Sequence, residues 1–588
     1  MGDLLPTCFT QHEPTGSCPA DFLTRSIWQT LSARQSSRDS VAATGLPQAA
    51  LSNPVDVEDL TFNYVGVGKP ILTVDSFHVV DGEVALVVGK SGGGKSTLVN
   101  CFNGVIPHIF KGNNPSGVVV YGNVVKDTPL PKLSSMVGTL LQDPETQVLN
   151  YTVEEEIAFG PENLMMPTDE IRRRVDAAIA TTGIENLRER ETYVLSGGEL
   201  QRVALAAVLA MQPKMLIMDE PTSNIDPEGT ARVFQTLTGL KGKTTLIVVE
   251  HKLERALHFV DRVILVDEGK IVFDIEKARL VEHVEELHHA GVDVPEHYLW
   301  AKKFGMDPAN IEGIRQRIVR EGVKLDSPQR GSGGKVVLEA FAHVEVPGKV
   351  LVDTELTLRE PQLLAIMGRN GAGKSTFLKT VMNFLDKDLT AKSKLVINGV
   401  DLSKASIQER GKHIAYVPQS FDLMLINKTV EEEISYSLRK RGVKDYKGPT
   451  EQFLKLFGLQ EFRRRDPLML SVGQRRRVAM AAALSAGVKI VMMDEPTSGQ
   501  DFYHKEIIAN EVKMLNGLGY SFIVVTHDAK FVYRYADSMV VLDGGKKVLE
   551  GTPEEVFASS QKYSVIPPTE YYLRNPDTPI PELGMLGV

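Results

Sequence analysis

Cysteine is scarce in this chain, which has three in 588 residues. Cys8, Cys18 and Cys101 form no CxxC pair and no cluster with histidine at the spacing of metal ligands. A disulfide framework is therefore not expected. Free thiols in a reducing compartment, the cytoplasm, are predicted instead.

Long apolar runs are also missing. No run reaches the roughly 18–20 uninterrupted apolar residues that span a bilayer. The longest candidate, 478–493, is broken by Ser485, Gly487 and Lys489. The N-terminal sequence also has no basic-then-apolar signal peptide. If the protein works at a membrane, another chain is expected to supply the spanning helices.

Excess positive charge is the third absence. The formal net charge is −9, which argues against a protein that coats nucleic acid. The short basic runs are predicted to be solvated helix faces. Histidines 283, 288, 289 and 297 are predicted to lie on helix surfaces, since no acidic or cysteine ligand set accompanies them. The basic runs are 172–174, 463–465 and 475–477.

The length and composition predict a globular protein of two or three domains, with 42% hydrophobic and 24% charged residues. Composition shifts divide the chain into five parts. They are a flexible N-terminal extension (1–52), a first domain (53–275), a helical linker with a Gly/Ser hinge (276–334), a second domain (335–555) and a Pro-rich tail predicted to be irregular (556–588).

The two domains are copies of each other. Five features recur in the same order at nearly constant separation, which indicates duplication of one domain. The pairs are Gly89 and Gly368 (368 − 89 = 279), Gln142 and Gln419 (419 − 142 = 277), Ser196 and Ser471 (471 − 196 = 275), Asp219 and Asp494 (494 − 219 = 275), and His251 and His527 (527 − 251 = 276).

Short apolar runs alternate with helical stretches in both copies, which predicts an α/β fold with buried parallel strands. Ligands are then expected at the carboxyl ends of the strands. The predicted strands are 84–88, 215–218 and 246–249 in the first copy, and 363–367, 490–493 and 522–525 in the second.

Each copy has a GxxxxGK[ST] phosphate loop between a predicted strand and a helix, as this motif requires. Backbone N–H groups of such a loop surround phosphates, the lysine reaches the β- and γ-phosphates, and the serine ligates Mg²⁺. The predicted binding residues are Gly89, Ser91, Gly92, Gly93, Gly94, Lys95, Ser96 and Thr97, and then Gly368, Asn370, Gly371, Ala372, Gly373, Lys374, Ser375 and Thr376.

An acidic pair ends a predicted strand in each copy. Asp219 and Asp494 are expected to hold Mg²⁺ through its water shell. Glu220 and Glu495 are placed to orient or deprotonate an attacking water. The alternative, a helix cap, is less favoured because a phosphate loop lies upstream each time.

Together these motifs resemble the ATP-binding-cassette (ABC) ATPase family. The resemblance covers about 450 residues and rests on LSGGELQRVALA (195–206), MDEPTSNID (218–226), LSVGQRRRVAMA (470–481), MDEPTSGQD (493–501) and VVTHD (524–528). It implies two P-loop NTPase domains of ABC type in tandem, each with a mostly parallel sheet and a helical subdomain, paired head to tail within the chain.

The resemblance also implies two composite sites for ATP and Mg²⁺. Glu220, Glu495, His251, His527, Gln142 and Gln419 would be catalytic, and Ser96, Gln142, Asp219, Ser375, Gln419 and Asp494 would serve the metal. Site one would join the first copy's Lys95, Ser96 and Glu220 to Ser471 and Gly473. Site two would join the second copy's Lys374, Ser375 and Glu495 to Ser196, Gly197 and Gly198.

Two positions depart from the family pattern. Val472 stands where the first copy has Gly197, so site one is expected to hold the γ-phosphate less closely. Tyr64 fits the aromatic that stacks on adenine, whereas the second copy has Phe341-Ala-His343-Val-Glu345 there and no clear equivalent. Both sites are nevertheless predicted to hydrolyse ATP.

One segment after the first glutamine indicates which kind of ABC protein this chain resembles. Gln142-Asp-Pro-Glu-Thr-Gln147 followed by TVEEEIAFGPENL (152–164) resembles the ATPase subunits of energy-coupling-factor (ECF) transporters, importers of vitamins or transition-metal ions. Thr152 with Glu155, and Thr429 with Glu432, are predicted capping boxes. The second copy has Pro418-Gln-Ser-Phe-Asp-Leu423 instead of QDPETQ, so the halves are expected to contact a partner unequally.

This resemblance implies two membrane partners, a transmembrane scaffold subunit and a substrate-capturing subunit. The protein would then be peripheral on the inner face of the cell membrane, with no direct nucleic-acid contact. The main alternative is a soluble tandem-ABC ATPase acting on ribosomes or nucleic acid. A fused sugar-importer ATPase is a third, although neither phosphate loop nor acidic pair is degraded.

Overall fold

The computed structural model describes residues 53–66, 68–113, 116–222, 227–251, 253–325, 327–331 and 334–580. The predicted N-terminal extension (1–52) and the last eight residues of the tail lie outside the described residues. The described residues from Asn53 onward belong to one compact unit.

Each copy is built on a six-stranded, mostly parallel sheet, as predicted. All neighbours in the two sheets are parallel except one antiparallel edge strand in each, β10 and β20. The first sheet has the order β10-β9-β3-β8-β7-β6, with β3 (Val84–Val88), β6 (Val137–Leu140), β7 (Met215–Asp219), β8 (Thr245–Val249), β9 (Arg262–Asp267) and β10 (Lys270–Glu276). The second has the order β16-β17-β18-β13-β19-β20, with β13 (Leu363–Met367), β16 (Ile414–Val417), β17 (Ile490–Asp494), β18 (Ser521–Val525), β19 (Ser538–Asp543) and β20 (Lys546–Gly551).

The central strands are apolar because both faces of each sheet are covered. Every residue of β3, β8, β13 and β18 is buried, which is why these runs show no polar alternation. A smaller antiparallel sheet packs over each phosphate-loop helix. These sheets are β2-β1-β4-β5, with β1 (Val55–Phe62), β2 (Leu72–Val79), β4 (Val118–Val120) and β5 (Asn123–Val124), and β12-β11-β14-β15, with β11 (Val336–Val346), β12 (Lys349–Arg359), β14 (Lys394–Ile397) and β15 (Val400–Asp401).

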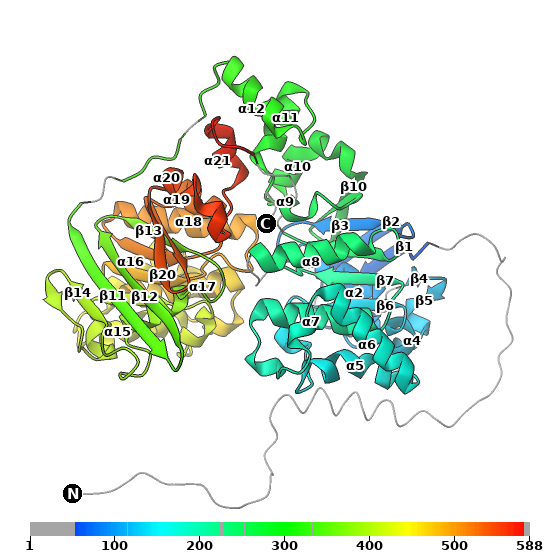
Figure 1. Cartoon of the computed structure of the whole chain (residues 1–588), viewed down its shortest axis with the longest axis horizontal. Helices are drawn as coiled ribbons and strands as arrows, with labels where there is room; N and C mark the ends of the chain where they lie inside the picture. The colour runs from blue at the N-terminus through cyan, green and yellow to red at the C-terminus, as the bar shows by residue number, and fades with distance from the viewer. Residues whose placement is uncertain are drawn as a thin grey trace, which may run out of the picture. The chain divides into compact units, whose positions relative to one another are not determined.

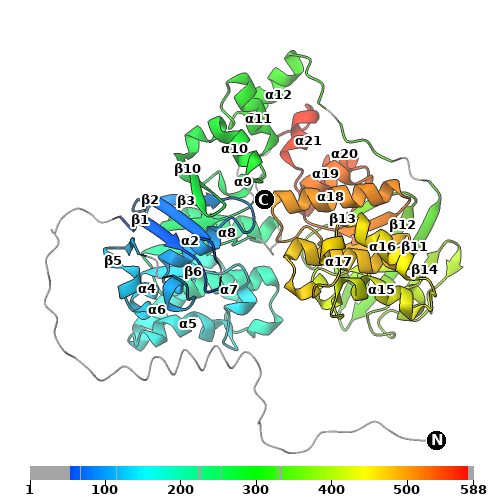
Figure 2. The ribbon, with the colours of Figure 1, turned by 180° about the vertical axis from the view of Figure 1, so that it is seen from behind.

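Three helices in each copy pack on one another as a helical subdomain, α5–α7 in the first (Figure 1) and α15–α17 in the second (Figure 2). The helices of the first copy are α2 (Lys95–Phe102), α3 (Val105–His108), α4 (Leu130–Ser134), α5 (Val153–Asn163), α6 (Thr168–Thr182), α7 (Gly197–Ala210), α8 (Pro227–Leu240) and α9 (Leu253–Ala256). Those of the second are α13 (Lys374–Met382), α14 (Ile407–Arg410), α15 (Val430–Lys440), α16 (Lys447–Leu456), α17 (Val472–Ser485), α18 (Phe502–Gly517), α19 (Ala529–Tyr535) and α20 (Pro553–Phe557).

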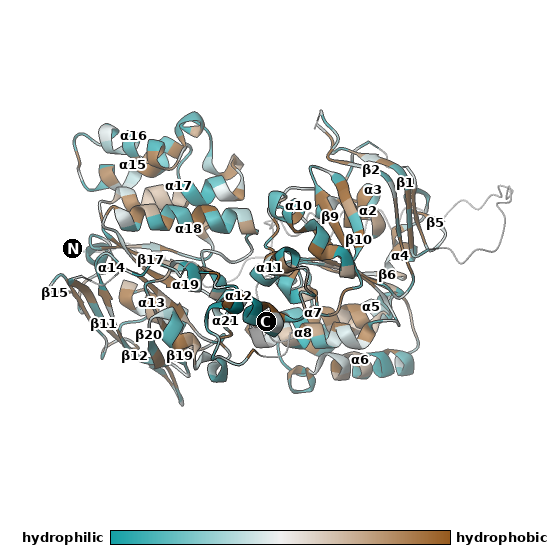
Figure 3. Cartoon of the chain, turned by 90° about the horizontal axis from the view of Figure 1, so that it is seen from above, coloured by the Kyte–Doolittle hydropathy of each residue, from teal (hydrophilic) through white to brown (hydrophobic). Residues whose placement is uncertain are grey.

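Side-chain caps fix where these helices begin. Thr152 and Glu155 form the predicted capping box of α5. In α15 only half of the predicted box is seen: the Thr429 side chain accepts the Glu432 N–H. Helices that cover the sheets are amphipathic and carry both apolar and polar residues, as the brown and teal bands of α8 show in Figure 3.

The segment between the cassettes contains α10 (Val284–His289), α11 (Glu296–Phe304) and α12 (Ile311–Arg320). It contributes to two cores. Leu280, Val284 and Leu287 pack into the core of the first copy, and Ile314 and Ile318 into that of the second.

Three surface predictions were wrong. The tail is not irregular: it forms α21 (Thr569–Arg574), beside α11 and α12 (Figure 1), because Tyr571 and Tyr572 bury their rings in the second core. His297 is buried, and burial lowers its pKa to about 4. Arg476 is also buried, with its guanidinium over the Phe421 ring. Sequence periodicity alone does not show which face a neighbouring segment will cover.

Candidate nucleotide site

The two phosphate loops have the same strained geometry. Each leaves a central strand, β3 or β13, and enters the helix that follows, α2 or α13. Gly89 and Gly368 both have φ 145°. A Cβ at Gly89 would lie 2.0 Å from the Val266 carbonyl oxygen, and one at Gly368 would lie 2.2 Å from that of Leu542. Only glycine fits, because a side chain would collide with the adjacent strand.

A buried lysine sits at the centre of each loop. Lys95 Nζ donates to the carbonyl oxygens of Gly89 and Lys90, both at 2.9 Å. Lys374 Nζ makes the equivalent bonds at 2.8 and 2.9 Å. Burial lowers the pKa of Lys95, although the charges of Glu220 and Asp219 oppose the shift. A cation enclosed by a turn at a helix N-terminus fits a bound phosphate.

Each loop serine contacts the aspartate that ends β7 or β17, one strand removed from the phosphate-loop strand in the sheet. Ser375 Oγ donates to Asp494 Oδ1 at 3.0 Å, and Ser96 hydrogen-bonds to Asp219. Burial raises the pKa of both aspartates, while the serine hydrogen bonds oppose the shift. A hydroxyl beside a carboxylate offers the hard oxygen ligands that Mg²⁺ prefers, so the donor set fits this ion.

The predicted catalytic glutamates are held by the predicted glutamine and histidines. Gln142 Nε2 donates to Glu220 Oε2 at 2.7 Å, and His251 Nε2 lies 2.5 Å from Glu220 Oε1. In the second copy His527 Nε2 lies 3.1 Å from Glu495 Oε1. Glu220 and Glu495 have φ of 50° and 48°, an uncommon backbone conformation for a side-chain-bearing residue. The same strained turn in both copies aims these carboxylates off the strand ends.

The signature serines cap the helices α7 and α17. Ser196 pairs with Glu199, and Ser471 with Gln474, in capping boxes in which each serine side chain accepts the N–H of the residue three positions on. Gly197 lines a cavity of about 640 Å³ together with the second copy's phosphate loop. The other lining residues include Asn370, Gly371, Gly373, Lys374, Ser375, Thr376, Gln419, Glu495 and His527.

The copies differ on the side where adenine was predicted to stack. Tyr64 lies in the connection between β1 and β2, with its hydroxyl 3.3 Å from Thr97 Oγ1. Strands β11 and β12 are joined by a tight turn at Pro347 and Gly348. Lys349 lines the cavity after this turn, so no aromatic takes the place of Tyr64 among its described lining residues.

Sequence reasoning missed two contacts of this region. Asp501 Oδ2 accepts the backbone N–H of Ser91 at 2.7 Å, which joins the second copy to the first copy's phosphate loop. Tyr416 donates its hydroxyl hydrogen to Asp494 Oδ2 at 3.4 Å. The repeat gave a signal for the first, because Asp226 and Asp501 keep the separation of the acidic pairs (501 − 226 = 275). Asp226 lies outside the described residues.

Comparison with known proteins agrees with this geometry. The ABC transporter family model matches twice, at residues 72–223 and 351–498. A protein of Saccharolobus solfataricus, provisionally named an ABC transporter ATP-binding protein, is 47% identical over 523 residues, which cover 88% of this chain and 98% of that one. The chain belongs to the ABC transporter family. It is an ATPase with two ABC cassettes in tandem, and its cofactors are ATP and Mg²⁺.

Two solved structures are also similar. The structure of cbiO1 from Clostridium perfringens, described as part of the ABC transporter complex cbiONQ, is 31% identical and covers 42% of this chain and 97% of that one, with a TM-score of 0.36. A chain in the complex of archaeal ribosomal stalk protein aP1 with archaeal ribosome recycling factor aABCE1 gives a TM-score of 0.55 at 19% identity, covering 85% and 92%. The second likeness shows the fold alone.

Proposed function

We propose that the protein is the ATP-hydrolysing subunit of an importer of the energy-coupling-factor kind, which moves a vitamin or a transition-metal ion. Its cassettes pair head to tail, and ATP closes them on a transmembrane scaffold subunit that holds a substrate-capturing subunit. The protein then lies in the cytoplasm against the inner face of the membrane. No helix in the described part of the chain is long and apolar enough to cross it.

In each site the phosphate loop would hold the nucleotide. The loop serine and the aspartate beside it, Ser96 with Asp219 or Ser375 with Asp494, would hold Mg²⁺. Mg²⁺ held by this serine and aspartate would neutralise charge on the phosphates of ATP. Glu220 and Glu495 accept a proton from the attacking water, while His251 and His527 hold these carboxylates. Buried apolar strands behind the loops keep these groups fixed relative to one another.

A matched pair of exposed apolar patches carries the partner proposal. The first patch is Leu149, Tyr193 and Val194, which are 67%, 67% and 57% exposed. The second patch is Ile426, Leu468 and Met469, which are 66%, 55% and 82% exposed. The positions correspond (426 − 149 = 277; 468 − 193 = 275; 469 − 194 = 275). Side chains of this kind on a soluble domain mark an interaction surface.

The first patch is connected to the ATP site through the turn after Gln142, of which Asp143 and Glu145 line the cavity. Segments 149–153 and 190–194 run side by side, since Thr192 N–H donates to the Tyr151 carbonyl at 2.9 Å. Along the chain, segment 149–153 follows the turn after Gln142 that resembles ECF transporter ATPases, and Gln142 donates a hydrogen bond to Glu220. A membrane subunit bound there would therefore contact the segment that carries the catalytic contact.

The experiment is to solubilise native membranes, purify the tagged full chain and identify its partners by mass spectrometry. We expect two integral membrane proteins. Leu149→Glu with Tyr193→Glu should lower their recovery at least about tenfold, because charge in a desolvated interface is costly. Val319→Glu, at an exposed apolar residue of α12, is the control. Recovery of ribosomes without an integral membrane protein would support the alternative, a tandem-ABC ATPase acting on ribosomes or nucleic acid.

A further inference from the structure

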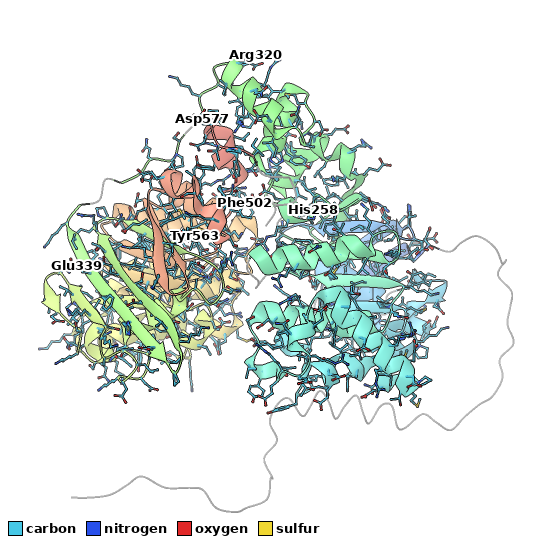
Figure 4. The ribbon with its side chains drawn as sticks, in the orientation of Figure 1. His258, Arg320, Glu339, Phe502, Tyr563 and Asp577 are labelled. Atoms are coloured by element: carbon cyan, nitrogen blue, oxygen red, sulfur yellow. The ribbon has the colours of Figure 1, made fainter. Side chains whose placement is uncertain are left out.

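The second cassette carries a histidine that the first lacks. His504 lies in the first turn of α18, after Phe502, which Figure 4 labels. The corresponding residue of the first cassette is Gly229, at the separation of the acidic pairs (504 − 229 = 275). The imidazole is thus a feature of one composite site and not of the duplicated domain.

His504 fixes the orientation of Asp501. Its Nδ1 lies 2.7 Å from Asp501 Oδ1, and its backbone N–H donates to the same oxygen at 2.9 Å. The other oxygen, Oδ2, accepts the Ser91 N–H of the first cassette's phosphate loop. Burial alone would raise the pKa of Asp501, but the His504 and Ser91 hydrogen bonds hold it below its usual range. Asp501 therefore stays an ionised acceptor between the two groups.

The imidazole also covers the signature turn. A Cβ at Gly473 would lie 2.8 Å from His504 Cδ2 and 3.1 Å from His504 Nε2. Ser471, Gly473 and His504 line one cavity of about 220 Å³. The ring thus occupies the space beside the signature glycine that site one retains, next to the position where Val472 replaces the other glycine.

We propose that His504 is a positioning residue of site one: it couples the signature turn of the second cassette to the phosphate loop of the first through Asp501. This inference rests on the proposed head-to-tail pairing. At the corresponding position of site two stands Gly229, which has no side chain that could make this coupling. The imidazole has charged neighbours on both helices. Asp501 caps its own helix α18 and Glu511 lies within it, while Arg476 and Arg477 belong to α17. Lys90 lies on the far side of Asp501.

The kinetic test uses the full chain with Glu495→Gln, so that turnover reports on site one. His504→Ala should lower kcat about tenfold and leave KM within about twofold, because the phosphate loop still binds ATP while the signature turn is misplaced. His504→Asn keeps an amide nitrogen as many bonds from the backbone as Nδ1, and should restore kcat to within about threefold. His504→Gln, whose amide reaches the Nε2 position instead, should not.

Asn510→Ala, at an exposed position on the same helix, is the matched control, and thermal unfolding checks each variant for folding. His504→Ala in a Glu220→Gln chain reports on site two. Equal losses of kcat in the two backgrounds, or no loss in either, would overturn the proposal. So would a loss that appears only as a raised KM.

A second measurement does not depend on turnover. Hydrogen exchange of the peptide that contains Ser91 should be faster in His504→Ala than in the parent, by about tenfold at that amide, and His504→Asn should restore protection. Unchanged exchange would contradict the proposal. Faster exchange, with a Glu495→Gln chain that hydrolyses no ATP, would uphold the His504 contact and refute two working sites.

Discussion

The two cassettes agree where phosphate would bind and differ where they face each other. Both have the same glycine geometry, buried lysine, serine–aspartate contact and strained glutamate. The copies differ at three places. They are the adenine side, where only the first copy has Tyr64, the signature turn, with Gly197 against Val472, and the start of α8 and α18, with Gly229 against His504. The two copies thus share the residues around the phosphate and differ in the side chains at these three places.

The junction between the cassettes shows this divergence most clearly. Glu254 on α9 and Lys530 on α19 are corresponding residues, at the separation of the two histidines (530 − 254 = 276). Both are largely buried and belong to one electrostatic cluster, in which the pKa of Glu254 is raised to about 7 and Lys530 stays charged. A symmetric dimer would place like charges at these positions. A single chain can place different residues at these two positions, here a carboxyl group with a raised pKa and a lysine paired with Asp293 and Glu570.

The largest predicted effect tests what the cassettes share. Glu220→Gln with Glu495→Gln should lower ATP turnover about 10²–10⁴-fold, the usual contribution of a positioned proton acceptor. Each single change should leave measurable turnover, because the other site still works. Steady-state phosphate release measures all three variants. A single change that leaves turnover unaltered would show that the matching site is not catalytic.

The next prediction removes the lysine of the junction. Lys530 forms ion pairs with Asp293 and, at 3.4 Å, with Glu570. Lys530→Met leaves the buried Glu570 and the partly exposed Asp293 without this partner, so the free energy of unfolding should fall by about 3–5 kcal/mol. Urea unfolding followed by fluorescence gives the change. Lys412→Met, which breaks an exposed pair with Glu409, is the control and should cost about 0–1 kcal/mol.

These two predictions also separate what the sequence could show from what it could not. The strands, phosphate loops and acidic pairs were predictable, because each is local and repeats. The helix α21 and the burial of His297 were not, since they depend on which segments far apart in the chain pack together. Asp501 lies between: the repeat marks its position, but only the fold brings it to Ser91.

The third prediction concerns the acid of the junction. Burial, and then the charge of Glu570, raise the pKa of Glu254 to about 7. The fold therefore favours the protonated form of Glu254. The free energy of unfolding that depends on this proton is lost as pH rises through 7. Glu254→Gln can still accept the Thr569 hydrogen bond and cannot ionise. It should stabilise the protein by up to about 3 kcal/mol at pH 8.

The gain from Glu254→Gln should shrink toward zero at pH 5, where the parent carboxyl is already protonated. Thermal unfolding at both pH values measures the difference. Glu162→Gln, at an exposed position on α5, is the control and should change the midpoint little at either pH. A gain that is equal at pH 5 and pH 8 would contradict a raised pKa at Glu254.

The smallest effect concerns the signature turns. Val472 is the first residue of α17 and is 46% exposed, so its replacement by glycine leaves no cavity. In a Glu495→Gln chain, Val472→Gly should raise kcat of site one about two- to threefold, because the turn can then approach the γ-phosphate more closely. Gly197→Val in a Glu220→Gln chain is the reciprocal change and should lower kcat of site two by a similar factor. If the two exchanges alter neither rate, the glycine position does not set the difference between the sites, and His504 becomes the main distinction between them.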